Sequence, residues 1–193
     1  EEQEMKQNLK LALVGAGERG QYCYAPYAKM HGYEIEFVAV ADPHKGRREK
    51  FVQDYHVPAE GVFETAEQFF ARPRMADAVL ICTQDSQHYA YACQAIDLGY
   101  SILLEKPISP SARECLDLQR RAEEKGTQIM VCHVMRYTKF YRKLKELIDS
   151  GVIGDVVHVT HTENVAYWHY AHSYVRGNWH KTADSSPMIL AKC

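Results

Sequence analysis

A surplus of charge of either sign is missing from this sequence. Its 193 residues contain 23 lysines and arginines against 25 aspartates and glutamates, which gives a formal net charge of -2. Residues of the two signs alternate along the chain and form no basic patch. Because binding to the phosphates of nucleic acid depends on such a patch, we expect no nucleic acid partner.

Long apolar runs are also absent. No segment approaches the roughly 20 apolar residues that cross a bilayer. The chain starts with the polar and acidic stretch EEQEMK, where a signal peptide is basic and then apolar. These absences predict a soluble, cytoplasmic protein with no membrane partner.

Paired cysteine motifs are lacking as well. None of the six cysteines belongs to a C-x-x-C pair, and two of them lie in apolar, strand-like runs. This usage is typical of reduced cysteines, so we expect neither a disulfide nor a metal site. The six are Cys23, Cys82, Cys93, Cys115, Cys132 and Cys193.

The first two thirds of the chain contain a regular alternation of apolar runs and amphipathic segments. Strands are expected at residues 9–14, 34–41, 78–82, 100–104 and 128–132. Helices are expected at residues 18–30, 45–55, 65–71 and 86–98, and from Ser109 as N-cap to Gly126. Pro26 is expected to bend or interrupt the first helix. The pattern predicts an α/β fold with a doubly wound parallel sheet covered on both faces.

The pattern changes after residue 133, where we place a domain boundary. A basic amphipathic helix at residues 139–150 and an alternating strand at 155–162 begin a second region. We expect a dinucleotide-binding domain at residues 1–133 and an incomplete α+β substrate domain at 134–193. An apolar run opens at Pro187 and the chain stops at Cys193, which predicts a fragment of a longer protein.

Three glycines, Gly15, Gly17 and Gly20, have the spacing G-x-G-x-x-G directly after the first predicted strand. By itself this motif also fits a plain turn between a strand and a helix. In a dinucleotide site, the first glycine allows the tight turn, the second lets the backbone approach a pyrophosphate, and the third lets helix and sheet pack closely. The N–H groups at the start of the helix then face the phosphates.

Asp42 ends the next predicted strand, about 20 residues beyond the glycines, where a carboxylate binds the adenosine ribose in NAD sites. Such a carboxylate repels a 2'-phosphate, so NAD is favoured over NADP. Two alternatives remain open. Asp42 could merely cap the following helix, and the basic residues Lys45, Arg47 and Arg48 could hold a 2'-phosphate.

The segment LLEKPIS, residues 103–109, resembles the glucose-fructose oxidoreductase, inositol dehydrogenase and MocA family when it is taken with the glycine motif. The likeness extends over nearly the whole chain. Further matching stretches are CTQDSQH, VCHVMRY, the turn Gly151 to Gly154, and RGNW from Arg176 to Trp179.

The resemblance implies a cofactor site and a cis peptide between Lys106 and Pro107. Arg19 and Gly20 would lie at the pyrophosphate, Asp85 and His88 beside the cofactor, and Glu105 and Lys106 beside the nicotinamide. The implied cofactor residues are Gly15, Gly17, Glu18, Arg19, Gly20, Asp42, Thr83, Asp85, His88, Glu105, Lys106 and His133, the last near the nicotinamide ribose or carboxamide.

Lys106 is the candidate catalytic residue on chemical grounds also. Hydride transfer from an alcohol requires the hydroxyl proton to leave and a cation to stabilise the developing alkoxide. A lysine at the carboxyl end of a parallel strand, where ligands bind, can do both. The alternative is a surface lysine paired with Glu105.

The sequence departs from the family pattern at several positions. Gln84 and Thr138 stand where proline is common, which affects only local turns. The family's catalytic aspartate and histidine should follow a segment like SSPMILAKC, where this chain stops, and Asp184 is no substitute for them. We therefore expect the chain alone to be inactive.

Aromatic and histidine residues crowd the segment from Glu163 to Lys181. Tyr167, Arg176 and Trp179 are candidates for a carbohydrate pocket, although the aromatics could instead fill a domain interface. A metal site is disfavoured because His158 and His161 point to opposite faces of the predicted strand.

These patterns and the resemblance together predict an NAD(P)-dependent enzyme that transfers a hydride between the nicotinamide and a sugar, cyclitol or related polyol. Through its second domain, when complete, the protein is expected to form a homo-oligomer. Two alternatives are an NAD-dependent glycosidase that oxidises its sugar transiently, and a non-catalytic dinucleotide-binding regulator.

Overall fold

The computed structural model describes residues 8–177 and 179–181. The chain divides into two compact units between Val131 and Cys132, and each is described by itself. Residues 182–193, which include Asp184 and the apolar end, lie outside the described residues. None of the described helices is long and apolar enough to cross a membrane.

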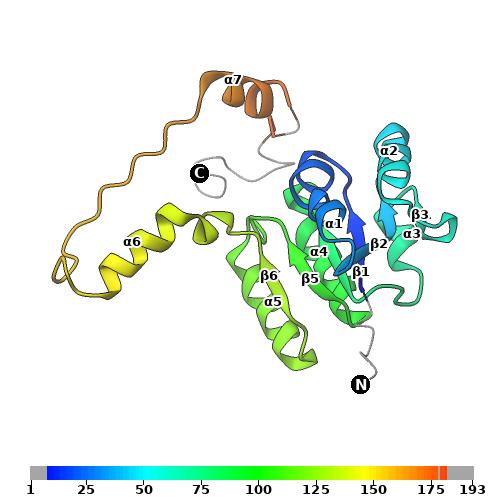
Figure 1. Ribbon diagram of the computed structural model, residues 1–193, viewed down its shortest axis with the longest axis horizontal. Helices are drawn as coiled ribbons and strands as arrows, with labels where there is room; N and C mark the ends of the chain where they lie inside the picture. The colour runs from blue at the N-terminus through cyan, green and yellow to red at the C-terminus, as the bar shows by residue number, and fades with distance from the viewer. Residues whose placement is uncertain (1–7, 178, 182–193) are drawn as a thin grey trace. The chain divides into compact units, whose positions relative to one another are not determined.

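The first unit is built on a parallel sheet of six strands in the order β3-β2-β1-β4-β5-β6 (Figure 1). The strands are β1 (Leu9–Val14), β2 (Ile35–Ala41), β3 (Val62–Phe63), β4 (Ala78–Ile81), β5 (Ser101–Leu104) and β6 (Ile129–Val131). This arrangement confirms the predicted doubly wound sheet. The strand order reverses between β1 and β4, and in open α/β sheets ligands bind beyond the carboxyl ends of the strands at such a point.

Helices cover both faces of this sheet. The helical segments are η1 (Glu18–Tyr24), α1 (Pro26–Met30), α2 (Lys45–Tyr55), η2 (Ala59–Gly61), α3 (Ala66–Phe70), α4 (Asp85–Asp97) and α5 (Ala112–Lys125). Alternate side chains of β1 belong to two separate hydrophobic cores. Ala12 and Val14 belong to the core beneath α3, α4 and α5, whereas Leu11 and Leu13 pack toward α1 and α2. Burial on both faces explains why the strands read as continuous apolar runs.

Two expectations about helix ends have different outcomes. The helix expected at residues 18–30 is interrupted before Pro26, as predicted, because proline has no N–H to continue it. The N-cap of α5 is Ser111, whose Oγ accepts a hydrogen bond from the Glu114 N–H, so the prediction of Ser109 was wrong. The hydroxyl of Ser109 instead accepts the N–H of Ser111 at 3.0 Å.

The second unit contains η3 (Val134–Tyr137), α6 (Lys139–Asp149), α7 (Tyr167–Tyr170) and η4 (Ala171–Val175). The expected helix at 139–150 is present. The strand expected at residues 155–162 was wrong, because this segment pairs with no other strand in the described part of the chain. A strand is defined by its ladder of hydrogen bonds, which alternating side chains alone cannot supply. Val157 is 93% exposed as a result.

Candidate functional site

The glycine loop joins β1 to η1 at the point where the strand order reverses. Gly15 has a φ of +95°, and a Cβ atom there would lie 2.6 Å from the carbonyl oxygen of Cys82. At Gly20, a Cβ would collide with the carbonyl oxygen of Gly15 and lie 2.8 Å from Cδ1 of Leu13. The fold itself therefore requires glycine at both positions.

Gly17 differs from its two neighbours in the motif. Its φ of -79° is open to any residue. A Cβ there would meet only Nη1 of Arg47, at 3.9 Å, and otherwise open space. Among the described residues nothing requires glycine at this position, but a pyrophosphate that approaches the backbone would. The loop thus fits the dinucleotide that the motif implies.

Asp42 follows β2 and lies beside this loop. Its Oδ2 accepts the N–H of Ala16 and its Oδ1 accepts the N–H of His44, each at 2.8 Å. The N-cap of α2 is His44, whose Nδ1, and not a carboxylate oxygen of Asp42, accepts the N–H of Arg47 at 3.3 Å. The helix-cap alternative for Asp42 is therefore wrong. Each oxygen of an ionised carboxylate has about two acceptor sites, so capacity remains for ribose hydroxyls, although the residue is only 4% exposed.

The three basic residues after Asp42 have different surroundings. Arg48 is buried and donates to the carbonyl oxygen of Asp42 at 2.6 Å and to Glu64 at 3.3 Å. Lys45 is exposed and lies 3.7 Å from Glu49. Only Arg47 reaches over the glycine loop, where its guanidinium lies near Gly17. Of the three, Arg47 is the one positioned to meet an anion at the loop.

Buried polar atoms without hydrogen-bond partners in the described part of the chain border the same edge of the sheet. Thr83 Oγ1 and Gln84 Oε1 follow β4, and Gln21 Nε2 lies on η1. Buried polar atoms are almost always satisfied, so such groups beside a loop of this kind fit a polar ligand. Thr83 was predicted from the sequence. Gln21 and Gln84 were not, because nothing local to a glutamine indicates that its amide is buried.

Glu105 and Lys106 follow β5 at the same edge. Glu105 is 6% exposed, its Oε1 accepts the hydroxyl of Tyr24, and its Oε2 accepts the backbone N–H of Lys106 at 3.0 Å. Lys106 is partly buried. The peptide between Lys106 and Pro107 is cis, as expected. The sequence did not indicate Tyr24, because its partner lies 81 residues away.

His88 and Asp85 lie on the first turns of α4, in the interior. The two ring nitrogens of His88 face the carbonyl oxygens of Pro107, at 2.7 Å, and Thr83, at 3.2 Å. With 1% of its surface exposed, His88 connects the loops after β4 and β5. Asp85 is 2% exposed at the start of the helix. The geometry of His88 is that of a group that positions the two loops.

Glu18 and Arg19 are exposed at the start of η1. Arg19 Nη1 donates to Cys23 Sγ at 3.8 Å. Partial burial lowers the pKa of Arg19, but attraction to Glu105 and Cys23 outweighs it, so the pKa lies above its ordinary value. A permanent positive charge therefore lies beside the glycine loop.

The remaining predicted residues belong to the second unit. His133 is exposed just before η3, and Tyr167 is 86% exposed on α7. The backbone N–H groups of Arg176 and Trp179 donate to the carbonyl oxygens of Ala171 and Ser173. The described residues contain no group of three or more side chains that could hold a metal ion.

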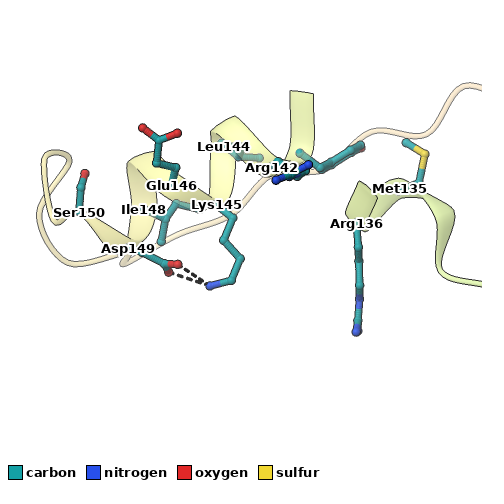
Figure 2. A pocket seen from close by; sticks show the side chains of 10 residues that line it. Met135, Arg136, Arg142, Leu144, Lys145, Glu146, Ile148, Asp149 and Ser150 are labelled. Atoms are coloured by element: carbon teal, nitrogen blue, oxygen red, sulfur yellow. Dashed lines mark hydrogen bonds and ion pairs between the residues drawn. The ribbon is translucent and has the colours of Figure 1, made fainter. Parts of the chain in front are cut away.

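A hollow of about 1060 Å³ borders α6 in this unit (Figure 2). Leu144 and Ile148 line it together with Lys145, whose Nζ lies 2.7 Å from Asp149 Oδ2. None of the site residues predicted from the sequence lines this hollow.

Comparison with known proteins agrees with the geometry of the first unit. Residues 9–133 match a family described as "Oxidoreductase family, NAD-binding Rossmann fold". The chain is 32% identical over 157 residues to an inositol 2-dehydrogenase of Pseudomonas savastanoi, a match that covers 79% of this chain and 46% of that protein. It is 26% identical over 183 residues to the scyllo-inositol 2-dehydrogenase (NADP(+)) of Bacillus subtilis, covering 94% of this chain and 48% of that protein.

Among solved structures, the WlbA dehydrogenase from Chromobacterium violaceum, in complex with NADH and UDP-GlcNAcA, shares the fold. Its TM-score is 0.70 at 18% identity, over 77% of this chain and 42% of that one. The chain thus spans about half the length of the curated relatives it matches. Because the family match extends over the whole sheet, the chain belongs to the glucose-fructose oxidoreductase, inositol dehydrogenase and MocA family of NAD-binding oxidoreductases.

Proposed function

We propose that the first unit binds NAD at the glycine loop, with NADP as the weaker ligand. Gly17 carries this proposal, because a glycine at the middle position of the motif, where a Cβ would point into open space, leaves room for a pyrophosphate to approach the backbone. The buried atoms Thr83 Oγ1 and Gln84 Oε1 support it as groups that need polar partners. Asp42 supports the preference for NAD, since its carboxylate would repel a 2'-phosphate.

We further propose that the full-length gene product oxidises a sugar, cyclitol or related polyol. NAD would supply the hydride acceptor. Lys106, at the carboxyl end of β5, would stabilise the developing alkoxide and take part in moving the hydroxyl proton. Residues 134–193 would belong to a substrate domain, in which Tyr167, Arg176 and Trp179 contact the sugar and through which copies assemble. The inositol dehydrogenases among the relatives support this substrate class.

Substitution of Gly17 tests the binding site directly. Gly17→Ala should leave folding unchanged, because its Cβ meets nothing closer than 3.9 Å, yet weaken NADH binding by tenfold or more, on the order of 1.4 kcal/mol. Fluorescence titration with NADH measures the affinity, and thermal unfolding measures stability.

Gly32→Ala is the matched control, since Gly32 precedes β2 and its Cβ would make an ordinary contact of 3.4 Å with the carbonyl oxygen of Ala28. Equal NADH affinities for wild type and Gly17→Ala would contradict the proposed site.

Turnover of polyols by the full-length gene product tests the reaction. Release of an aryl leaving group without net NADH would indicate the glycosidase instead.

A further inference from the structure

Tyr24 connects two parts of the candidate site that are remote in sequence. It is the last residue of η1, the helix that starts at the glycine loop. Its hydroxyl donates a hydrogen bond to Oε1 of Glu105, which directly follows β5. The helix at the cofactor loop is thereby joined to the strand end that carries Lys106.

The carboxylate of Glu105 is held at both oxygens. Oε1 accepts from Tyr24, and Oε2 accepts the backbone N–H of Lys106 at 3.0 Å. The backbone N–H of Glu105 itself donates to the carbonyl oxygen of Ile81 on β4, at 3.0 Å. The peptide plane between residues 105 and 106 is one determinant of the direction in which the Lys106 side chain leaves the backbone. A carboxylate that holds this plane therefore restrains that direction.

The surroundings of Glu105 explain why this anchor needs a donor such as Tyr24. The carboxylate is 6% exposed, and a buried carboxylate is costly unless hydrogen bonds and a nearby opposite charge compensate it. Arg19 lies five residues before Tyr24 on the same helix, and attraction to Glu105 contributes to its raised pKa. Arg19 and Tyr24 therefore approach Glu105 from one element.

We propose that Tyr24 is a positioning residue that, through Glu105, holds the backbone of Lys106 in the orientation required for hydride transfer. The inference rests on the proposed role of Lys106. Tyr24 itself acts only through Glu105 and is not a catalytic residue.

Amide hydrogen exchange, measured by NMR on the ¹⁵N-labelled chain, tests this positioning. Tyr24→Phe removes one oxygen atom and keeps the ring. It should speed exchange of the Lys106 amide about tenfold, as expected for weakening a hydrogen bond to a charged group. The neighbouring Glu105 amide, which bonds the backbone of β4, should not change. Equal acceleration of both amides would mean general loosening of the strand end and would overturn the proposal, as would an unchanged Lys106 amide.

Tyr27→Phe is the matched control. Its hydroxyl bonds another carboxylate, Glu34, at 2.7 Å, and the change should leave the Lys106 amide unaffected. A second variant, Glu105→Gln, should accelerate the Lys106 amide like Tyr24→Phe, and the double variant should add little, because both changes break one network. Full additivity would contradict the proposal.

A turnover measurement separates this inference from the proposed function. In the full-length gene product, Tyr24→Phe should lower kcat about tenfold while KM for NAD stays within about twofold, since only the orientation of Lys106 changes. A rise in KM with unchanged kcat would overturn the positioning role. If the wild type binds no NADH, the proposed function fails, whereas the exchange experiment still decides whether Tyr24 orients Lys106.

Discussion

Asp42 has a structural role that does not depend on a ligand. Its two oxygens hold the N–H groups of Ala16 and His44, so the carboxylate shapes the glycine loop from the end of β2. Arg47 lies over the same loop with its guanidinium near Gly17. In the proposed site, this anion and this cation would act in opposite directions on a 2'-phosphate.

Replacement of Asp42 by asparagine tests the anion. The wild type should bind NADH more tightly than NADPH, and Asp42→Asn should reduce that preference by about tenfold, because like-charge repulsion with the 2'-phosphate is removed. Parallel fluorescence titrations with the two nucleotides measure the ratio.

Asp77→Asn controls for the loss of a carboxylate that binds backbone. Asp77 Oδ2 accepts the N–H of Lys10 at 2.8 Å, outside the glycine loop, and its replacement should leave the ratio unchanged. An NADPH preference in the wild type would remove the proposed role of Asp42 and favour Arg47 as the deciding residue.

At the scale of elements, α4 and α5 are joined by a polar cluster on their surface. The Tyr89 hydroxyl donates to Asp117 Oδ2 at 2.6 Å, and Arg120 and Arg121 lie 2.8 Å and 2.6 Å from the same carboxylate. These hydrogen bonds, from Tyr89 first and then from the two arginines, hold the pKa of Asp117 well below its usual value. The bond to Asp117 also raises the pKa of Tyr89 to about 12.

The two shifts predict opposite pH dependences. Because the folded pKa of Asp117 is depressed, its contribution to stability is present above its unfolded pKa of about 3.9 and is lost as the pH falls below that value. The folded pKa of Tyr89 is raised, so its contribution is complete below about pH 10 and is lost as the pH rises toward 12.

Urea unfolding between pH 2 and 5 measures the acid side of this prediction. The free energy of unfolding should fall less steeply with decreasing pH in Asp117→Asn than in wild type. Tyr89→Phe should have the same effect to a smaller extent. The expected difference between variant and wild type is a small change in the slope of the unfolding free energy against pH. It is small because the cluster is exposed to solvent and each ion pair contributes little. An unchanged slope in Asp117→Asn would contradict the assignment.

Sequence pattern predicted most of these elements and missed others for local reasons. The helices α2 and α4 and the strand β2 agree closely with expectation, because apolar periodicity and flanking prolines and glycines act within a few residues. The strand β3 is only two residues long and gave no pattern to detect. The strand expected at 155–162 shows the reverse error, since alternation was present without a partner to pair with.

At the scale of the whole chain, the two units differ in how their backbone is satisfied. Val131 ends a sheet in which every strand is paired. In the second unit, residues 156–166 have no helical or strand structure and are almost wholly exposed. Segments of this kind, with small or polar residues and exposed backbone, are preferred sites of proteolysis.

Limited proteolysis tests the proposed division of the chain. Thermolysin cleaves before apolar residues, and its first cuts should fall at Val156, Val157 or Val159, which are exposed. The amino-terminal fragment should keep its affinity for NADH, because the glycine loop, Asp42 and Lys106 all precede the cut. Mass spectrometry locates the cut, and titration of the purified fragment measures binding. A first cut within the parallel sheet, or loss of binding after the cut at 156–159, would contradict the division.

The sequence alone determined the parallel sheet and the glycine turn. Both follow from apolar periodicity and from residues close together along the chain, where backbone geometry is decided locally. The family followed from the resemblance of motifs spread along the chain and from the match over residues 9–133. Tertiary structure alone decided that Gly17 is the one glycine of the motif that the fold does not need, that Arg47 and not Arg48 reaches the loop, and that Tyr24 holds Glu105. These contacts join side chains from separate strands and helices, so they depend on how the elements pack, which no local pattern specifies.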